Sequence, residues 1–320
     1  MMESIRFYDF NFQPVWDIQF VISANWQLYY NDIGTFELHT DIQDALTRVL
    51  QTHPYLVAVQ GDKQAIITSR QFEGSECVLY GRTCNWLLTR RLTPAFEAKT
   101  DNVETVCRSF VSDAFADTPE VVLGTAAGIE TQLAFEQKSD TTTFDAVQEA
   151  LDKVKAGHRL RFDPHGKKWI FEVLTGKTLP LILSEDNRNA YESAYTENFL
   201  DYYSGGWYEA EQAEDADGHR PDPVRTYLSG DESKTGIYRW ECALSGDTQE
   251  AAKSDLQKQK WVKSVTAKLR GIHFGTDYSL GDSLQFKMQA GGYFLSDTKR
   301  VEGIHIWYEA QEIGEEPILS

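Results

Sequence analysis

Carboxylates gather in one stretch of the chain, and paired carboxylates are the groups that glycoside hydrolysis requires. The cluster consists of Glu209, Glu211, Glu214, Asp215 and Asp217. A general acid needs a dry pocket to raise its pKa, whereas this stretch is rich in Gly, Pro and charged residues. We therefore interpret residues 212–223 as a mobile, solvated loop and not as the catalytic pair of a tail-associated hydrolase.

Two groups of residues could bind a metal ion. Asp215 and Asp217 could hold Ca²⁺, but no D-x-D-x-D-G loop with a terminal Glu surrounds them. His158 and His165 flank one expected strand, and Pro164 places His165 at a turn, where a solvated histidine is the expected state. We expect no metal site and no cofactor. The other histidines are isolated in the sequence and indicate no site: His39, His53, His219, His273 and His305.

Two further motifs resemble catalytic or phosphate-binding sequences. Ser245-Gly246-Asp247 lacks the G-x-S-x-G elbow of a serine nucleophile and indicates a loop followed by a helix N-cap. Gly124-x-x-x-Gly128 is not followed by the basic residue of a phosphate-binding loop. We expect that the chain is not an enzyme.

The cysteines and the N-terminus restrict the setting of the protein. Cys77, Cys84, Cys107 and Cys242 are scattered without a C-x-x-C pair, so neither a metal cluster nor a disulfide framework is indicated. Cys107 falls on the apolar face of an expected helix, which indicates a core thiol. Residues 1–6 lack the pattern of a signal peptide, and no apolar stretch approaches the length of a membrane span. We expect synthesis in a cytoplasm and no membrane anchor.

The chain is strongly acidic. It has 320 residues, with 49 Asp and Glu against 31 Lys and Arg and a net charge of −18. Phosphate binding needs clustered Lys and Arg, so nucleic acid is disfavoured as a bound ligand. The charge is compatible with solubility alone and with a surface that keeps DNA at a distance.

The elements that must position these residues are mainly strands. Residues 1–98 show short alternating apolar segments with frequent turns, which predict a small antiparallel β-barrel. Trp26, Leu28 and Tyr30, followed by Phe36 and Leu38, predict a hairpin, and residues 41–50 predict a helix. The other predicted strands are residues 5–9, 14–18, 55–60, 64–69 and 76–81.

Residues 99–178 predict a small α+β domain of two helices and a hairpin. Asp101-x-x-Glu104 is a variant of the capping box before an apolar stripe that runs from Val103 to Phe115. A second helix is expected over 143–156, with Gly157 as its C′ stop. Strands over 159–162 and 168–173 complete the domain.

Residues 179–320 predict a second β-barrel domain with one helix near 248–260. Among the aromatic residues 202, 203, 207 and 208, we expect alternate positions in the core and the rest at an interface. The fold class is therefore mainly β, with two barrels separated by an α+β insert. The predicted strands are residues 194–203, 207–212, 265–269, 284–288, 293–295 and 301–308.

An ordered set of motifs resembles the siphophage tail-tip hub family, the ReqiPepy-type siphovirus tail proteins. The set begins with Trp26 and the G-x-F-E-L strand from Gly34 to Leu38, and continues with Gly81-Arg82-Thr83-Cys84-Asn85-Trp86-Leu87-Leu88-Thr89-Arg90-Arg91-Leu92. Asp277-Tyr278-Ser279-Leu280-Gly281-Asp282 is similar to the family's D-Y-x-L-G-D. Gln27-Leu28, where the family often has a basic pair, and the long 212–223 segment depart from the pattern.

The resemblance implies a structural role in a phage tail or a related injection device. Such hubs are similar to the baseplate hubs of contractile phages, and their two barrels resemble tail-tube subunits. Three subunits would form a pseudo-sixfold ring that joins the sixfold tail tube to a threefold tip, with DNA passing through without specific binding. The implied partners are further copies of the chain, the distal tail protein, the tape-measure protein C-terminus, and a central spike, fibre or receptor-binding protein.

Two other functions stay open at this point. A tail-associated glycan or peptidoglycan hydrolase would need an appended catalytic domain, and we expect none because the chain ends at Ser320 after the last predicted strands. A receptor- or glycan-binding tip protein would need a shallow aromatic groove on its outside. In a ring, we expect an acidic lumen, with Arg90, Arg91 and the basic residues of 253–268 at subunit contacts or outside.

Overall fold

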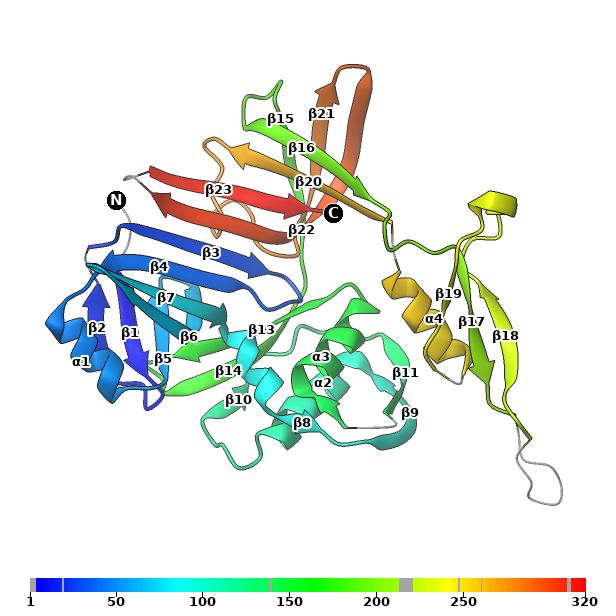
Figure 1. Cartoon of the computed structure of the whole chain (residues 1–320), viewed down its shortest axis with the longest axis horizontal. Coiled ribbons are helices and arrows are strands. Elements are labelled where there is room, and N and C mark those ends of the chain that lie inside the picture. Colours follow the sequence, from blue (N-terminus) through cyan, green and yellow to red (C-terminus); the bar gives the residue numbers. More distant parts are fainter. Residues whose placement is uncertain are drawn as a thin grey trace. The chain divides into compact units, whose positions relative to one another are not determined.

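A computed structural model describes residues 4–18, 20–137, 140–212, 221–246, 248–259, 261–309 and 312–320. The chain forms two compact units (Figure 1). The large unit comprises Met1–Ser193 and Thr266–Ser320, and the small unit comprises Ala194–Val265. Within the described residues, no helix combines the length and hydrophobicity needed to cross a bilayer.

The fold is mainly β, as expected, and it is dominated by one curled, half-barrel sheet of 13 strands. Its N-terminal strands are β1 (Ile5–Asp9), β2 (Pro14–Ile18), β3 (Ser23–Tyr29), β4 (Thr35–Asp41), β5 (Leu56–Gln60), β6 (Lys63–Glu73) and β7 (Glu76–Thr83). Its C-terminal strands are β15 (Thr178–Ser184), β16 (Ala190–Asn198), β20 (Val262–Leu269), β21 (Ser283–Ala290), β22 (Tyr293–Glu309) and β23 (Glu312–Leu319).

The predicted hairpin is confirmed as β3 and β4. Trp26 and Phe36 are directly opposite each other in the register, and their ring centroids lie 4.2 Å apart. Both side chains are buried because alternate residues of a strand point to the same face of the sheet. The burial of these aromatic rings fixes the register, since a shift by one residue would expose them.

The two ends of the chain meet within this sheet. The order is β16-β20-β23-β22-β3-β4-β7-β6-β5-β1-β2, so β22 lies between β23 and β3 (Figure 1). Ile306 of β22 is opposite Trp26 of β3 in an antiparallel register. The strands expected in two separate segments therefore share one sheet. The expected strands at 293–295 and 301–308 are one continuous strand, β22. Its first half pairs with β21, and its second half pairs with β23 and β3.

Between the two sets of strands lie two helices and three small sheets. The helices are α2 (Val103–Ala114) and α3 (Thr143–Asp152), preceded by the 3-10 helix η1 (Cys84–Arg90). The strands are β8 (Leu92–Thr93), β9 (Phe96–Asn102), β10 (Val121–Leu123), β11 (Gln132–Gln137), β12 (Thr141–Thr142), β13 (Gly157–Asp163) and β14 (Lys168–Leu174). Their apolar faces share one core with Tyr8, Phe12, Val57 and Ile66. The domain boundaries at residues 98 and 178 stay a prediction.

The ends of both helices differ from the expected capping. Asn102, not Asp101, is the N-cap of α2, and its Oδ1 accepts the Thr105 N–H at 3.0 Å. The α3 helix ends at Asp152, and the chain reverses through Lys155, which has φ +56°. Gly157 instead begins β13, where a Cβ would lie 2.2 Å from the Tyr30 carbonyl oxygen. Close backbone approach, and not helix termination, requires this glycine.

Helix α1 (Asp44–Thr52) is close to its predicted position between β4 and β5. The Arg70 guanidinium of β6 donates to the carbonyls of His53 and Pro54, at 2.7 and 2.9 Å, and also to that of Leu50. A cation at this end of a helix complements the carbonyl groups that have no intrahelical partner.

The small unit has its own sheet and core. The sheet order is β18-β17-β19, formed by β17 (Gly205–Ala210), β18 (Val224–Ser229) and β19 (Glu241–Ala243), and the unit also contains the 3-10 helix η2 (Gly236–Tyr238). Helix α4 (Gln249–Lys258) begins at the N-cap Thr248 and buries Ala252 and Leu256 against Tyr208 and Leu244. This helix matches the expected span of 248–260, while the strand at 207–212 begins two residues earlier.

Candidate functional site: a polar sheet face and the junction beside it

The carboxylates considered for catalysis do not form a buried pair. Glu209 and Glu211 are exposed, with Glu209 on β17 and Glu211 just after it. Glu214, Asp215 and Asp217, with most of the 212–223 segment, lie outside the described residues. A solvated position does not supply the environment that keeps a carboxylic acid protonated at neutral pH.

The two histidines considered as a metal pair lie at opposite ends of β13. His158 is 1% exposed and lies opposite Val173 of β14, whereas His165 is exposed in the loop after β13. His158 Nδ1 is 2.8 Å from Asn31 Oδ1, and burial lowers its pKa to about 3, so it is a neutral donor at physiological pH. No group of three metal-ligating side chains occurs among the described residues.

The Gly124–Gly128 loop contains an anion site that the chain itself fills. Glu104 is 4% exposed, and its carboxylate accepts the N–H groups of Ala127, Gly128 and Ile129 at 2.7, 2.8 and 3.1 Å. Successive backbone N–H groups of this kind bind anions. Glu104 therefore anchors the loop to α2 instead of completing the expected capping box.

The remaining motif residues are structural. The Ser245 N–H donates to Asp255 of α4 at 2.8 Å, and Thr248 is the helix N-cap. All four cysteines are free thiols. Cys107 is buried, as expected for a core thiol, and burial raises its pKa to about 12, which makes the reactive thiolate rare.

The register places a continuous polar face on the large sheet. Ile304 and Ile306 of β22 are buried, so His305, Trp307 and Glu309 point to the opposite side. The same rule applies through β3, β4 and β7, because residues directly opposite each other share a face. We define the polar face as the side of β23, β22, β3, β4 and β7 that carries Glu312, Glu316, Glu309, Trp307, His305, Asn25, Gln27, Glu37, His39, Asp41, Glu76, Tyr80 and Arg82.

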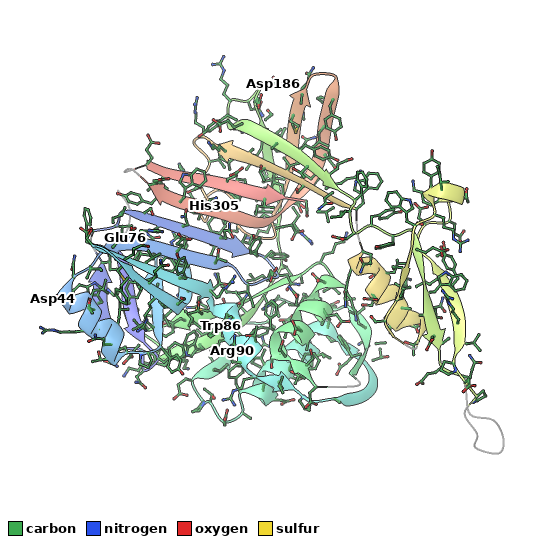
Figure 2. The ribbon with its side chains drawn as sticks, in the orientation of Figure 1. Asp44, Glu76, Trp86, Arg90, Asp186 and His305 are labelled. Atoms are coloured by element: carbon green, nitrogen blue, oxygen red, sulfur yellow. The ribbon has the colours of Figure 1, made fainter. Side chains whose placement is uncertain are left out.

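Two histidines of the polar face, His39 and His305, have different surroundings, and Figure 2 labels His305. His39 lies between Glu37 and Glu76, with nitrogen–oxygen distances of 2.7 and 2.5 Å. Partial burial lowers its pKa, but the hydrogen bonds to both carboxylates outweigh that effect and the pKa is raised. The pKa of His305 is lowered because burial outweighs the attraction of Glu316. The isolated positions of these histidines in the sequence gave no hint of this face.

A glycine keeps the polar face flat beside His305. The rings of His305 and Trp307 lie 5.0 Å apart, and Gly314 is opposite Trp307 on β23. A Cβ at Gly314 would lie 2.0 Å from the Trp307 ring. The indole can therefore lie across β23 only when this position has no side chain.

Next to this sheet, three segments converge on Tyr30, in a region that we call the junction. Gly281 has φ +85°, and a Cβ there would lie 2.2 Å from the Tyr30 ring. The Tyr30 hydroxyl donates to the Leu174 carbonyl at 2.8 Å, and its carbonyl accepts the His158 N–H at 3.2 Å. The D-Y-x-L-G-D motif thus serves packing, with Asp282 accepting the Lys177 and Ser279 N–H groups.

Two side-chain amides of the junction complete the free edge of β13. Asn85 Oδ1 accepts the Leu160 N–H at 2.7 Å, and its Nδ2 donates to the His158 carbonyl at 3.2 Å. Gln64 makes the equivalent pair with the N–H and carbonyl of Phe162, both at 2.7 Å. These amides occupy the place of a neighbouring strand and satisfy backbone groups that would otherwise be buried without partners.

The small unit carries an exposed aromatic cluster. Phe199, Tyr202, Trp240 and Trp261 have ring centroids 5.1 to 6.2 Å apart. Phe199, Trp240 and Trp261 remain 47, 42 and 41% exposed. Of the four aromatic residues singled out in the sequence, Tyr208 is buried and Tyr202, Tyr203 and Trp207 are half-buried.

Comparison with known proteins gives a fold and a family. No curated protein matches the chain. The crystal structure of the 43 kDa tail protein of prophage MuSo2 from Shewanella oneidensis is similar, with a TM-score of 0.63 and 11% identity over 99% of this chain and 98% of that chain. A tail protein from Neisseria meningitidis MC58 has a TM-score of 0.63 and 15% identity, over 99% and 95% of the two chains.

The same fold occurs in prophage tail protein gp18 from Listeria monocytogenes EGD-e, with a TM-score of 0.54 and 12% identity over 99% of this chain and 94% of that one. At these identities the likeness establishes the fold alone. Residues 4–206 also match a protein family directly. This match confirms the resemblance seen in the motifs: the chain belongs to the Siphovirus ReqiPepy6 Gp37-like protein family of phage tail proteins.

Proposed function

We propose that this protein is a non-enzymatic hub of the tail tip, and that the polar face lines an axial channel for DNA. The charge of that face supports the proposal most directly. Its strands carry the carboxylates of Glu37, Asp41, Glu76, Glu309, Glu312 and Glu316, with Arg82 as the arginine at its margin.

An acidic wall would suit such a channel because DNA must slide through it without binding. Each Lys or Arg that neutralises a phosphate releases counterions, and about 6–10 such contacts change affinity by orders of magnitude with salt. The carboxylates of the polar face alternate with polar Asn25, Gln27 and Tyr80, which leaves Arg82 as the arginine of this face that could make such a contact. Six of the chain's 49 acidic residues then lie where they serve the passage of DNA, although solubility alone would also favour an acidic chain.

The arrangement in the particle would be a homotrimer. In this proposal, the strands of residues 1–98 and of residues 179–320 each correspond to one tube-like barrel, so three copies supply six. The terminal strands β2 and β16 pair with one strand each among the described residues, which leaves edges for pairing between copies. The tail tube would change from sixfold to threefold symmetry at this ring.

The partners in such a ring follow from its place in the tail. We propose the distal tail protein on one side, the tape-measure protein C-terminus at the axis, and a central spike, fibre or receptor-binding protein on the other side. In the solved structure of a Francisella PdpA–VgrG complex, a protein with a similar fold is assembled with a partner, with a TM-score of 0.52 and 10% identity over 99% of this chain and 52% of that chain.

The test is a cryo-electron microscopy reconstruction of tail tips that contain this protein. The proposal expects three copies around the axis, with Glu309 and Glu316 facing the lumen. Copies that bury the polar face against protein, or an assembly with no axial channel, would contradict it. Glycan hydrolysis by the purified chain, abolished by Glu209→Gln and Glu211→Gln, would support the hydrolase alternative instead.

A second candidate function is glycan or receptor binding by the small unit. The exposed aromatic cluster of Phe199, Tyr202, Trp240 and Trp261 supports it, because half-exposed aromatic rings are frequent at recognition surfaces. Trp240→Ala with Trp261→Ala should then abolish adsorption of tails to host cells while leaving tail assembly unchanged. Unchanged adsorption would remove this candidate.

A further inference from the structure

A pocket of the large unit combines aromatic rings with positive charge, and none of its lining residues belongs to the polar face. Its volume is about 560 Å³, in the range of ligand pockets. It is formed where two hairpin tips meet the end of η1 and the loop after α2. We define the aromatic pocket by its aromatic lining residues and two of its cations: Phe10, Phe12, Phe115, Trp169, Arg90 and Lys167.

The floor of the aromatic pocket is rigid. Phe12, Phe115 and Trp169 are only 4 to 6% exposed, and Phe10 packs edge-on against Trp169 at 5.5 Å. Asp9 holds the first hairpin tip, because its carboxylate accepts the N–H groups of Asn11 and Gln13 at 2.9 and 2.8 Å. A preformed floor loses little conformational freedom when a ligand binds.

Both hairpin tips have a backbone conformation that costs free energy. Phe12 has φ +63° and Lys167 has φ +52°, a region that residues with a side chain rarely adopt. A bulky aromatic residue gains nothing locally from this conformation. In this structure it brings the Phe12 ring onto Phe162, stacked at 5.0 Å, and completes the floor. Strained residues of this kind are concentrated at functional sites.

The rim of the aromatic pocket is positively charged, in contrast to the chain as a whole. Arg90, Arg91 and Lys167 line it together with one carboxylate, Glu120, although the whole chain has a net charge of −18. Arg91 is paired with Asp117 at 3.0 Å. Arg90 lies over the Trp86 ring at 4.2 Å (Figure 2), and no described carboxylate forms an ion pair with Arg90 or Lys167.

We propose that the aromatic pocket binds a peptide segment of a partner protein in which an aromatic side chain is flanked by carboxylates. The ring would insert into the cavity beside Phe10, the one half-buried ring of the four, and the carboxylates would pair with Arg90 and Lys167. A stacked nucleobase is a poorer fit, because the floor rings are almost fully buried and offer no open platform. A chain with so much negative charge would repel acidic segments everywhere except at such a positive site.

The test uses the full chain and defined peptides. Chemical shifts of the Trp169 indole would be followed during titration with N-acetyl-Glu-Phe-Glu-amide. We expect saturable binding that weakens about tenfold in Arg90→Gln with Lys167→Gln, and that also weakens as salt screens the charges. The matched control is Lys168→Gln, which changes the exposed neighbour of Lys167 outside the pocket and should leave binding unchanged.

The other probes separate the alternatives. Peptides with Lys-Phe-Lys or Glu-Ala-Glu should bind at least about tenfold more weakly if both charge and ring are recognised. Equal binding of either peptide, an equal loss in Lys168→Gln, or no saturable shift with Glu-Phe-Glu would overturn the proposal. If an oligothymidylate binds more tightly than Glu-Phe-Glu and displaces it from the pocket, the pocket binds nucleic acid. If the mass of the protein in solution rises with its concentration and Arg90→Gln abolishes this rise, the pocket binds a second copy of the chain. Either result also overturns the proposal.

Discussion

The junction lies beside the sheet that carries the polar face, yet the two regions use polar groups in opposite ways. In the junction, Asn85, Gln64 and Tyr30 are buried or half-buried, and each polar atom has a backbone partner. On the polar face, Glu309 and Glu312 are exposed, and Glu316 is half-buried next to His305. The comparison separates two roles: the junction positions stabilise the fold, whereas the polar face is free to serve a function outside the chain.

The largest effect is expected at the glycines of the junction. Gly281→Ala would force a Cβ to 2.2 Å from the Tyr30 ring at φ +85°, and we expect a loss of more than about 3 kcal/mol. Gly275→Ala is the matched control, because Gly275 has φ +79° with nothing within 4 Å of an added Cβ, so the substitution should cost only about 1–2 kcal/mol. Urea denaturation gives both values. Equal losses would show that Tyr30 does not determine the requirement for glycine.

A smaller but still large effect is expected from the amides at the β13 edge. Asn85→Leu would leave the Leu160 N–H and the His158 carbonyl without partners, at about 1–3 kcal/mol for each buried group. Gln27→Leu, on the polar face, should change the free energy of unfolding by no more than about 0.5 kcal/mol. A loss below 1 kcal/mol in Asn85→Leu would mean that water replaces the amide at this edge.

The pKa values of His158 in the junction and His39 on the polar face are shifted in opposite directions. Burial lowers the pKa of His158 to about 3, so the unfolded chain binds this proton first and stability falls as pH decreases from about 6.5. His39 has a raised pKa, so its contribution is present below the unfolded pKa and is lost as pH rises through the folded value. Histidine-selective NMR titration would show both. A normal pKa for both rings would remove the contrast.

The smallest effect on stability is expected from charge reversal on the polar face. Glu309→Lys with Glu316→Lys should shift the free energy of unfolding by less than about 1 kcal/mol, because exposed ion pairs contribute little. DNA ejection from particles with this variant should nevertheless slow, and the delay should decrease at high salt. Asp186→Lys, in the turn between β15 and β16, is the control away from the face (Figure 2). Equal slowing by the control would attribute the effect to total charge.

The sequence predicts local elements well because alternation and helical periodicity are local properties. Trp26 and Phe36 were assigned to one hairpin, and the stripe from Val103 to Phe110 to one helix, and both are present. Sequence patterns did not reveal that β22 pairs with β3, because that contact joins residues almost the whole chain apart. The polar face depends on this pairing, which is why His39 and His305 looked isolated in the sequence.

The sequence patterns also led to the wrong structural role for two residues, Glu104 and Gly157. Glu104 suggested a capping box, but its carboxylate binds the N–H groups of residues 127–129. Gly157 suggested the end of a helix, but its position is determined by Tyr30. In both cases the local pattern is correct and the partner is distant. A partner at long range cannot be identified from spacing, whereas the family resemblance, which rests on many motifs together, was confirmed by a match over residues 4–206.

The central claim is that the polar face surrounds the path of DNA. The most direct measurement is a threefold-averaged reconstruction of the assembled tail tip at side-chain resolution. The proposal predicts Glu37, Glu309 and Glu316 of three copies at the wall of a continuous channel, with a negative potential along the axis. A polar face turned outward or covered by another protein, or a channel wall formed by Lys and Arg, would contradict it.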